Sequence, residues 1–323
     1  MNSLPIDLIQ YCIFDKLDFV TQIHFRQICK RLNRIDIHNL YYNIDKKYLK
    51  KLSDDILLNY SKVKYLNSYN NQKITNVNHM TKLHILNASE NCGIDDNGIK
   101  NLNLIELIGF NNPKITNVNH MTNLKILKAS DECGIDDNGI KDLNLIKLNA
   151  CHNPKIKNIN HMTNLQILDA SYNCGIDDNG IKDLNLIKLD ASFNSKITNV
   201  NHMTNLRTLY ASGITCGIDN AGFKDLNLIG LNARDNSKIT NIKHMTNLQM
   251  LNASLRCGIN DDCIKDLNLI KLTAYNNEKI KNVNHMTNLQ ILDASFRCGI
   301  DDNGIKDLNL IELYADDNHR ITN

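Results

Sequence analysis

Two residue types recur at fixed positions of the sequence and could carry metal chemistry. In each of six repeated segments, a cysteine follows a histidine by 13 or 14 residues. The cysteines are Cys92, Cys133, Cys174, Cys216, Cys257 and Cys298, and the histidines are His79, His120, His161, His202, His244 and His285. Cysteine and histidine are the usual ligands of structural zinc, so a row of metal sites is the first hypothesis.

Paired carboxylates form a third row, which could bind calcium or act as an acid and a base. The pairs are Asp95–Asp96, Asp136–Asp137, Asp177–Asp178 and Asp301–Asp302. The surrounding text, I-D-D-N-G-I, places an aspartate directly before a short helical turn, where a carboxylate accepts hydrogen bonds from free backbone amides. We expect helix caps, because catalysis needs one site and not four. The sequence has no Gly-rich phosphate loop and no G-x-S-x-G or H-E-x-x-H motif, so we do not expect an enzyme.

These rows arise from an internal repeat that fills most of the chain. The text that starts at Lys73 returns at periods of 41, 41, 41, 42 and 41 residues. The later copies start at Lys114, Lys155, Lys196, Lys238 and Lys279, and a seventh begins at Arg320. Each unit contains two shorter turns of the form L-x-x-L-x-A-x-x-N, for example 165–173 and 186–194. Such a short period predicts a solenoid of stacked parallel strands.

The two-turn pattern resembles the leucine-rich repeat, L-x-x-L-x-L-x-x-N/C, with alanine in place of the third leucine. The resemblance implies an α/β solenoid, a leucine-rich-repeat horseshoe with a parallel sheet on its concave face. It covers residues 73–323, while 46–72 are expected to form a linker and a divergent capping half-repeat. The asparagine that ends the second turn can bond to the backbone of the adjoining turn. These residues are Asn71, Asn112, Asn153, Asn194, Asn236, Asn277 and Asn318.

The repeat geometry argues against metal sites and disulfides. Equivalent residues of successive units lie two strand spacings apart, about 10 Å. A disulfide needs Cα atoms within about 7 Å, and a zinc site needs four converging ligands. Each unit has one cysteine and one histidine of these rows, with no C-x-x-C pair. We therefore expect no metal, no other cofactor, reduced and buried cysteines, and histidines that belong to a repeated turn.

The N-terminal 45 residues lack the repeat and have a helical pattern of apolar residues. The arrangement Leu4-Pro5, then Ile13-Phe14-Asp-Lys-Leu17, then Phe25-Arg-Gln-Ile28-Cys29-Lys-Arg-Leu32 resembles the F-box, although the aromatic residue that follows Cys-Lys in that family is missing. The resemblance implies a small all-α F-box over residues 1–45 that binds a Skp-type adaptor. The adaptor-binding residues would be Leu4, Pro5, Ile9, Ile13, Phe14, Leu17, Phe25, Ile28, Cys29 and Leu32. We expect the stripe formed by Ile9, Ile13, Phe14 and Leu17 to be exposed in the isolated chain.

The copies differ most at positions that should point out of the sheet, whereas the turn text H-M-T-N-L and G-I-K-D-L-N-L-I is almost unchanged. Aromatic residues and an arginine stand at these varying positions, and such residues are common at binding hot spots. They are Phe110, Tyr172, Phe193, Tyr210, Arg234, Tyr275, Phe296 and Tyr314. We expect them to bind a target protein on the concave face. Neutral variation on a solvated surface is the alternative.

Composition narrows the classes of partner. The 37 lysines and arginines nearly balance the 35 aspartates and glutamates, so we expect neither nucleic acid nor a membrane surface as the main partner. No apolar run is long enough to span a bilayer. The charged N-terminus lacks a cleavage site and does not read as a secretory signal. We expect an intracellular protein, in the cytoplasm or nucleus.

The F-box resemblance implies the substrate-recognition subunit of an SCF-type cullin ubiquitin ligase. Its N-terminus would bind the Skp-type adaptor, and through it the cullin, while the repeat face holds a target protein. The alternative is a protein-binding leucine-rich-repeat scaffold or inhibitor with no link to ubiquitin. F-boxes joined to near-identical, Asn-rich repeats are also similar to those of giant DNA viruses of amoebae, which would place the protein in a host cell.

Overall fold

The computed structural model describes residues 49–322 without a gap. Before them it describes only isolated positions, namely Ile6, Ile9, Gln10, Leu17, Thr21, Gln22, Arg26, Asn39 and Leu40. Of the expected adaptor-binding residues, Leu4, Pro5, Ile13, Phe14, Phe25, Ile28, Cys29 and Leu32 lie outside the described residues. Ile9 is fully buried and Leu17 is half-buried. The expectation that the whole stripe is exposed is therefore wrong at Ile9, which packs within the chain itself.

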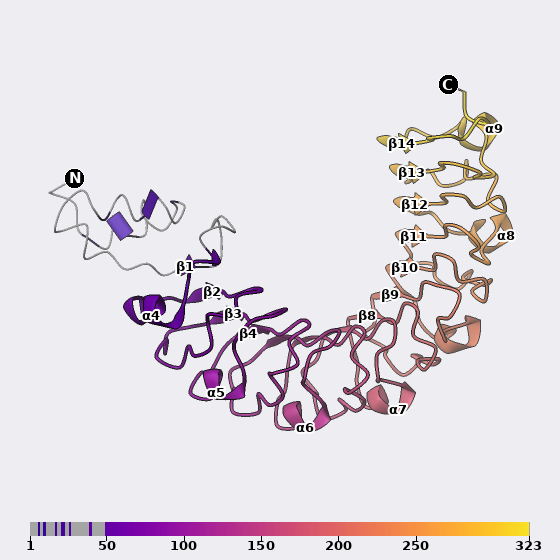
Figure 1. Cartoon of the computed structure of the whole chain (residues 1–323). Helices are drawn as coiled ribbons and strands as arrows, with labels where there is room; N and C mark the ends of the chain where they lie inside the picture. The colour runs from indigo at the N-terminus through magenta and orange to yellow at the C-terminus, as the bar shows by residue number, and fades with distance from the viewer. Residues whose placement is uncertain are drawn as a thin grey trace. The chain divides into compact units, whose positions relative to one another are not determined.

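The chain divides into two compact units, and the first comprises Met1–Asn149. Its strands are β1 (Asn39–Leu40), β2 (Tyr65–Asn67), β3 (Ile85–Asn87), β4 (Glu106–Ile108), β5 (Ile126–Lys128) and β6 (Lys147–Asn149). Its short helices are α4 (Asp54–Leu57), η3 (Leu58–Tyr60), α5 (Asp96–Ile99) and α6 (Asp137–Ile140). Each strand pairs in parallel with the next (Figure 1). Residues 1–45 are expected to be all-α but contain β1, so the sheet starts earlier than the sequence indicates.

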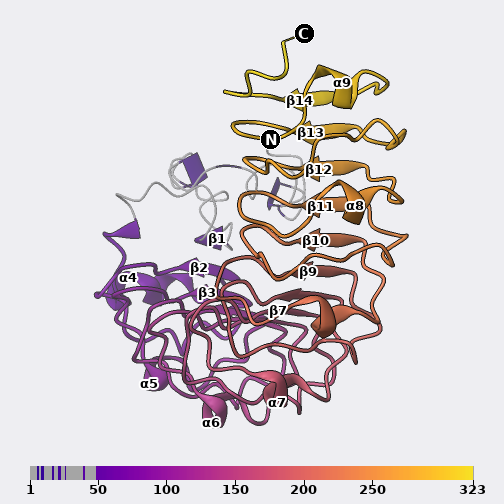
Figure 2. The ribbon, with the colours of Figure 1, turned by 90° about the vertical axis from the view of Figure 1, so that its right-hand side faces the viewer.

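The second unit comprises Ala150–Asn323. Its strands are β7 (Ile167–Asp169), β8 (Lys188–Asp190), β9 (Thr208–Tyr210), β10 (Gly230–Asn232), β11 (Met250–Asn252), β12 (Lys271–Thr273), β13 (Ile291–Asp293) and β14 (Glu312–Tyr314). Its helices are α7 (Asp178–Ile181), η4 (Asn220–Phe223), α8 (Asp261–Ile264) and α9 (Asp302–Ile305). Figures 1 and 2 show strands β10 to β14 as successive parallel rungs, with α8 and α9 on the side away from the strands.

The core of each unit is a stack of closely similar apolar slices. The central residue of every strand from β2 to β13 is a buried leucine, and those of paired strands lie in register. In one slice, eleven apolar side chains are at most 4% exposed. They are Ile197, Val200, Met203, Leu206, Leu209, Ala211, Cys216, Ile218, Phe223, Leu226 and Leu228. A single slice leaves its two flat sides open, so the burial depends on its neighbours. The predicted parallel solenoid is confirmed.

The paired aspartates cap the short helices, as expected, but only the first of each pair does so. The Asp177 carboxylate accepts a hydrogen bond from Gly180 N at 2.9 Å, and Asp95, Asp136 and Asp301 make the same bond. The second aspartate reaches the following turn. Asp178 accepts bonds from Thr198 N at 2.7 Å and Thr198 Oγ1 at 2.5 Å. One carboxylate of the pair thus closes a helix and the other joins two turns.

The asparagine that ends the second turn of each double repeat is a buried connector, which confirms its expected structural role. Asn194 Nδ2 donates to Ala170 O at 2.8 Å and to Ile176 O at 3.1 Å, and Asn194 Oδ1 accepts from Lys196 N at 2.9 Å. The same three bonds recur at Asn112, Asn236, Asn277 and Asn318. One side chain therefore satisfies three backbone groups in the interior.

Replacing Asn194 with alanine should lower the free energy of unfolding by about 2 to 4 kcal/mol, because it leaves buried backbone groups without partners. Urea unfolding followed by circular dichroism would measure the change. The matched control is Asn173→Ala, which removes the exposed asparagine at the same position of the neighbouring turn. That change should cost less than about 0.5 kcal/mol. Equal costs for the two variants would contradict the connector role.

Candidate functional site

The histidine row belongs to the repeated turn, as expected. A ring nitrogen of His202 lies 3.1 Å from Ile181 O, at the end of α7. His79, His120 and His285 make the same contact with Leu57 O, Ile99 O and Ile264 O. Each of these rings satisfies a carbonyl that a short helix leaves open. Among the residues that the structure describes, no three His, Cys, Asp or Glu side chains converge as metal ligands would.

The cysteine row is a buried stack of free thiols. All six repeat cysteines are fully buried and form no disulfide. Burial raises the pKa of the Cys174 thiol to about 12 and that of the Cys216, Cys257 and Cys298 thiols to about 11. Cys151 is half-buried, and Cys12 and Cys29 lie outside the described residues. The row is therefore part of the apolar core and does not supply nucleophiles.

The six repeat cysteines should react at least about ten-fold more slowly than Cys151 with a thiol reagent at pH 8, because a raised pKa and burial keep the thiolate scarce. Alkylation with iodoacetamide, followed by peptide mass spectrometry, would give the rate for each cysteine. Denatured protein serves as the control, in which all six should react at similar rates. Inter-repeat disulfides in the native protein, or labelling of Cys174 as fast as Cys151, would overturn the buried stack.

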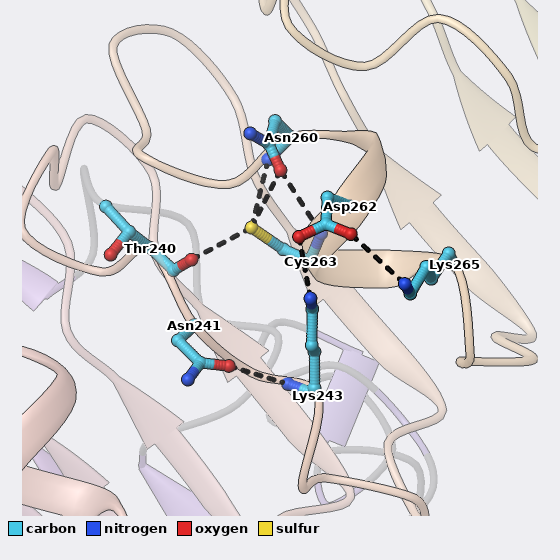
Figure 3. A network of polar contacts seen from close by, with 7 residues as sticks. All are labelled: Thr240, Asn241, Lys243, Asn260, Asp262, Cys263 and Lys265. Carbon is cyan, nitrogen blue, oxygen red and sulfur yellow. Dashed lines mark hydrogen bonds and ion pairs between the residues drawn. The ribbon is translucent and has the colours of Figure 1, made fainter.

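One double repeat departs from the others on the side of the short helices (Figure 3). Cys263 in α8 replaces a glycine that the other five units keep. In those five units, a Cβ added to the glycine would lie only 2.0 to 2.2 Å from a backbone carbonyl oxygen. The Cys263 thiol donates instead to Thr240 O at 2.9 Å. Lys243 replaces an asparagine that the other five units keep. Its Nζ lies 2.6 Å from Asp262 Oδ2, and Lys265 pairs with the same carboxylate. These exposed ion pairs contribute little stability.

The surface formed by the outward strand residues and by the residues that directly follow the strands, called the sheet face below, carries the expected target-binding residues. Phe110 is half-buried in the first unit, and the other seven lie in the second. Tyr172, Phe193, Phe296 and Tyr314 are between 37% and 49% exposed. Arg234 is also exposed, and Tyr210 and Tyr275 are half-buried. The side chains are accessible, and some of them meet directly.

Three rings stack just beyond the carboxyl ends of the strands, and we call His152, Tyr172 and Phe193 the aromatic stack. Ring centroids are 4.5 Å apart between His152 and Tyr172 and 4.9 Å between Tyr172 and Phe193, with planes 19° and 10° apart. Phe193 then covers Gly213, where an added Cβ would lie 2.4 Å from its ring. The distances between ring centroids match the distance between neighbouring strands in a sheet. His152 is not among the expected target-binding residues, although it occupies one of the same varying positions.

The aromatic stack is built on a strained backbone. His152, Tyr172 and Phe193 have φ of 56° to 58°, in the left-handed region, and nine further non-glycine residues share this conformation at equivalent positions. Bulky residues seldom adopt it. It is held by hydrogen bonds between turns, from Tyr172 N to Ser192 O at 2.7 Å and from Phe193 N to Ser212 O at 2.8 Å. The repeat thus imposes one ring position per turn.

Two further features complete the sheet face of the second unit. Lys188 Nζ lies 4.8 Å from the centroid of the Tyr210 ring, and Tyr275 and Phe296 have centroids 4.8 Å apart. A hollow of about 280 Å³ opens around Gly230. Its lining includes Thr208, Tyr210, Met250, Asn252 and Lys271. The hollow exists because β10 has a glycine at an outward position, a signal that sequence analysis misses.

Phe193→Ala should lower the free energy of unfolding by less than about 1.5 kcal/mol, the scale of one aromatic pair. Leu189→Ala, in the buried middle of β8, should cost about 2 to 5 kcal/mol because it leaves a cavity. Lys182→Ala, after α7, serves as the exposed control. Chemical denaturation of the three variants would measure these differences. A loss for Phe193→Ala as large as that for Leu189→Ala would show that the ring is a core element.

The segment 1–43 matches the F-box domain family. A comparison with curated protein sequences finds no match. Among solved structures, the functional domain of InlJ from Listeria monocytogenes, which includes a cysteine ladder, is 21% identical, with a TM-score of 0.45 over 85% of this chain and 64% of that one. The Rad7 and Elc1 complex in yeast gives 17% identity and a TM-score of 0.44 over 98% and 90%. The TLR13–ssRNA13 complex gives 17% and 0.43 over 87% and 51%.

The chain thus spans about half of the TLR13 chain and less than two thirds of the InlJ chain. At these scores the structural similarities carry no argument about partners. No helix among the described residues has the length and apolar character to cross a membrane.

The family match and the strand order together describe the chain. An F-box domain at the N-terminus precedes a leucine-rich-repeat solenoid built from parallel strands.

Proposed function

We propose that this protein is the substrate-recognition subunit of an SCF-type cullin ubiquitin ligase. The F-box binds a Skp-type adaptor and, through it, the cullin, while the sheet face of the second unit binds a target protein. The match of residues 1–43 to the F-box domain is the observation that carries this proposal. The chain needs no chemistry of its own for this role, since it raises the effective concentration of the target near the ubiquitin-transferring subunit.

The division of the repeat into two unlike sides supports the target-binding part. On the helix side, side chains such as Asp178 bond to the next turn. On the sheet face, exposed rings and an exposed arginine differ from turn to turn. Exposed aromatic residues gathered on one surface are typical of protein interaction sites. The sheet face is therefore where a target would find specific contacts.

A protein-binding scaffold or inhibitor without any link to ubiquitin is the second candidate. It is favoured by the described part of the N-terminus, where Ile9 is buried within the chain and β1 pairs with β2. N-terminal residues that pack on the repeat would act as its cap. Adaptor binding separates the two candidates. The similarity of the Asn-rich repeats to those of giant DNA viruses of amoebae stays a prediction. A role of the protein in a host cell depends on that similarity and stays a prediction too.

Full-length protein with Ile13→Ala and Phe14→Ala should lose adaptor binding by a factor of about 100 or more. Each large apolar side chain removed from an interface costs about 2 kcal/mol. Isothermal titration calorimetry with a purified Skp-type adaptor would measure the dissociation constants. Phe193→Ala is the matched control, because it removes a ring on the sheet face and should leave adaptor affinity unchanged. If the wild-type chain does not bind the adaptor, the ubiquitin-ligase role is wrong and the scaffold remains.

A further inference from the structure

Two aspartates occupy adjacent outward positions on the sheet face of the second unit, and each carboxylate accepts a hydrogen bond from the serine two residues later. Asp169 on β7 and Asp190 on β8 are direct partners in the strand register. Among the described strand pairs within each unit, this is the only one that sets two like charges side by side. Like charges directly opposite destabilise a sheet. Neighbouring outward pairs avoid this, for example Asn232 with Asn252.

The carboxylate of Asp190 forms no ion pair within the described part of the protein, although the charge of Lys188 favours its ionised form. It accepts a hydrogen bond from Ser192 N at 2.9 Å, and no described lysine or arginine lies within ion-pair distance. The nearby Lys188 Nζ lies over the Tyr210 ring instead. Burial raises the pKa of Asp190, with a further contribution from the charge of Asp169. A cation placed here would relieve both effects.

An apolar feature lies beside this pair. Tyr210 on β9 is the register partner of Asp190, and Gly230 on β10 is the partner of Thr208. A Cβ added to Gly230 would lie 3.4 Å from Met250 Cε and 3.5 Å from Thr208 Cγ2, which are ordinary contacts. The Gly230 hollow, of about 280 Å³, therefore has room at its floor for at least a methyl-sized group. Met250 is 46% exposed, so it presents an apolar wall to such a guest.

From this geometry we propose that strands β7 to β12 bind an extended segment of the target protein with two anchors. An arginine or lysine of the segment lies on Asp169 and Asp190, and an apolar side chain enters the Gly230 hollow. This proposal rests on the proposed function, because it describes the segment by which the target protein of the ligase would bind. The anchors lie two strand spacings and two residues apart, roughly 12 Å, which an extended chain spans in three or four residues.

The charges along this strip select against other occupants. Nucleic acid would bring phosphates against Asp169 and Asp190, so it is disfavoured. A purely polybasic peptide would meet Lys271, which lines the far side of the hollow on β12. Lys188, which precedes Asp190 on β8, carries a positive charge near the two carboxylates and weakens their attraction for distant cations. The complementary segment carries one basic residue followed or preceded by an apolar one, not a run of charge.

A phage-displayed library of random dodecapeptides, selected on the full-length protein, would test this proposal. Enriched peptides would be synthesised, labelled and titrated by fluorescence anisotropy. We expect enrichment of an arginine or lysine three or four residues from a leucine, isoleucine, methionine or phenylalanine. Binding should weaken at least ten-fold for Asp169→Asn with Asp190→Asn, and at least ten-fold for Gly230→Leu, which fills the hollow.

Asp293→Asn is the matched control, because it neutralises an outward aspartate on β13, which lies outside the strip. It should change peptide affinity less than two-fold. The double Asp169/Asp190 variant should also unfold at a higher urea concentration than wild type, since it removes a like-charge pair. A folding defect cannot produce both a more stable protein and weaker binding.

The proposal is overturned if no peptide is enriched, if the enriched peptides lack a basic residue, or if the Asp169/Asp190 and Gly230 variants bind them as wild type does. Adaptor affinity, measured on the same samples, separates this outcome from a failure of the proposed function. Peptide binding without adaptor binding would leave the two-anchor site standing on a scaffold protein. Adaptor binding without peptide binding would leave the ligase role and remove this site.

Discussion

The buried asparagine at the end of every second turn is the interaction on which the repeat depends. Its amide donates to two carbonyl groups and its carbonyl accepts one backbone N–H, all inside the core. An aspartate at this position would lack the donors, and an alanine would lack every partner. Unpaired backbone groups in an apolar interior are costly. The position therefore keeps its residue type in each double repeat, while the first turn places a buried cysteine in the interior near the equivalent position.

The direction of side-chain hydrogen bonds explains why the two sides of the repeat differ. On the helix side, bonds run between successive turns, as from Thr198 to Asp178 or from Asn201 to Ala221 O. A change there disturbs two turns at once. On the sheet face, several outward residues bond within their own turn, as Asp190 does with Ser192, and others pair with the adjacent turn, as Lys128 does with Glu106. A residue that bonds only within its own turn can be exchanged without loss to its neighbours, so differences between the turns collect on this face.

The backbone also decides where the varying aromatic residues of the sheet face can lie. The left-handed residue after each strand recurs at the spacing of the strands, which is close to the stacking distance of aromatic rings. Consecutive rings at this position therefore touch, as His152, Tyr172 and Phe193 do. Gly213, with φ of 95°, takes the equivalent position in the next turn, and the row of rings ends there because glycine has no side chain. The surface is pre-arranged by the solenoid, so a partner would order few side chains on binding.

The sequence by itself determined the repeat, the inward and outward residues of each strand, the buried cysteines, the capping aspartates and the asparagine connectors. These follow from short-range rules of alternation and capping, which a period of 41 or 42 residues repeats many times. Only the tertiary structure decided the inter-turn role of Asp178, the burial of Ile9, the aromatic stack that includes His152, the pairing of Asp169 with Asp190 and the hollow at Gly230. Each of these depends on which residues of different turns lie in register, and register is set by stacking the turns against one another.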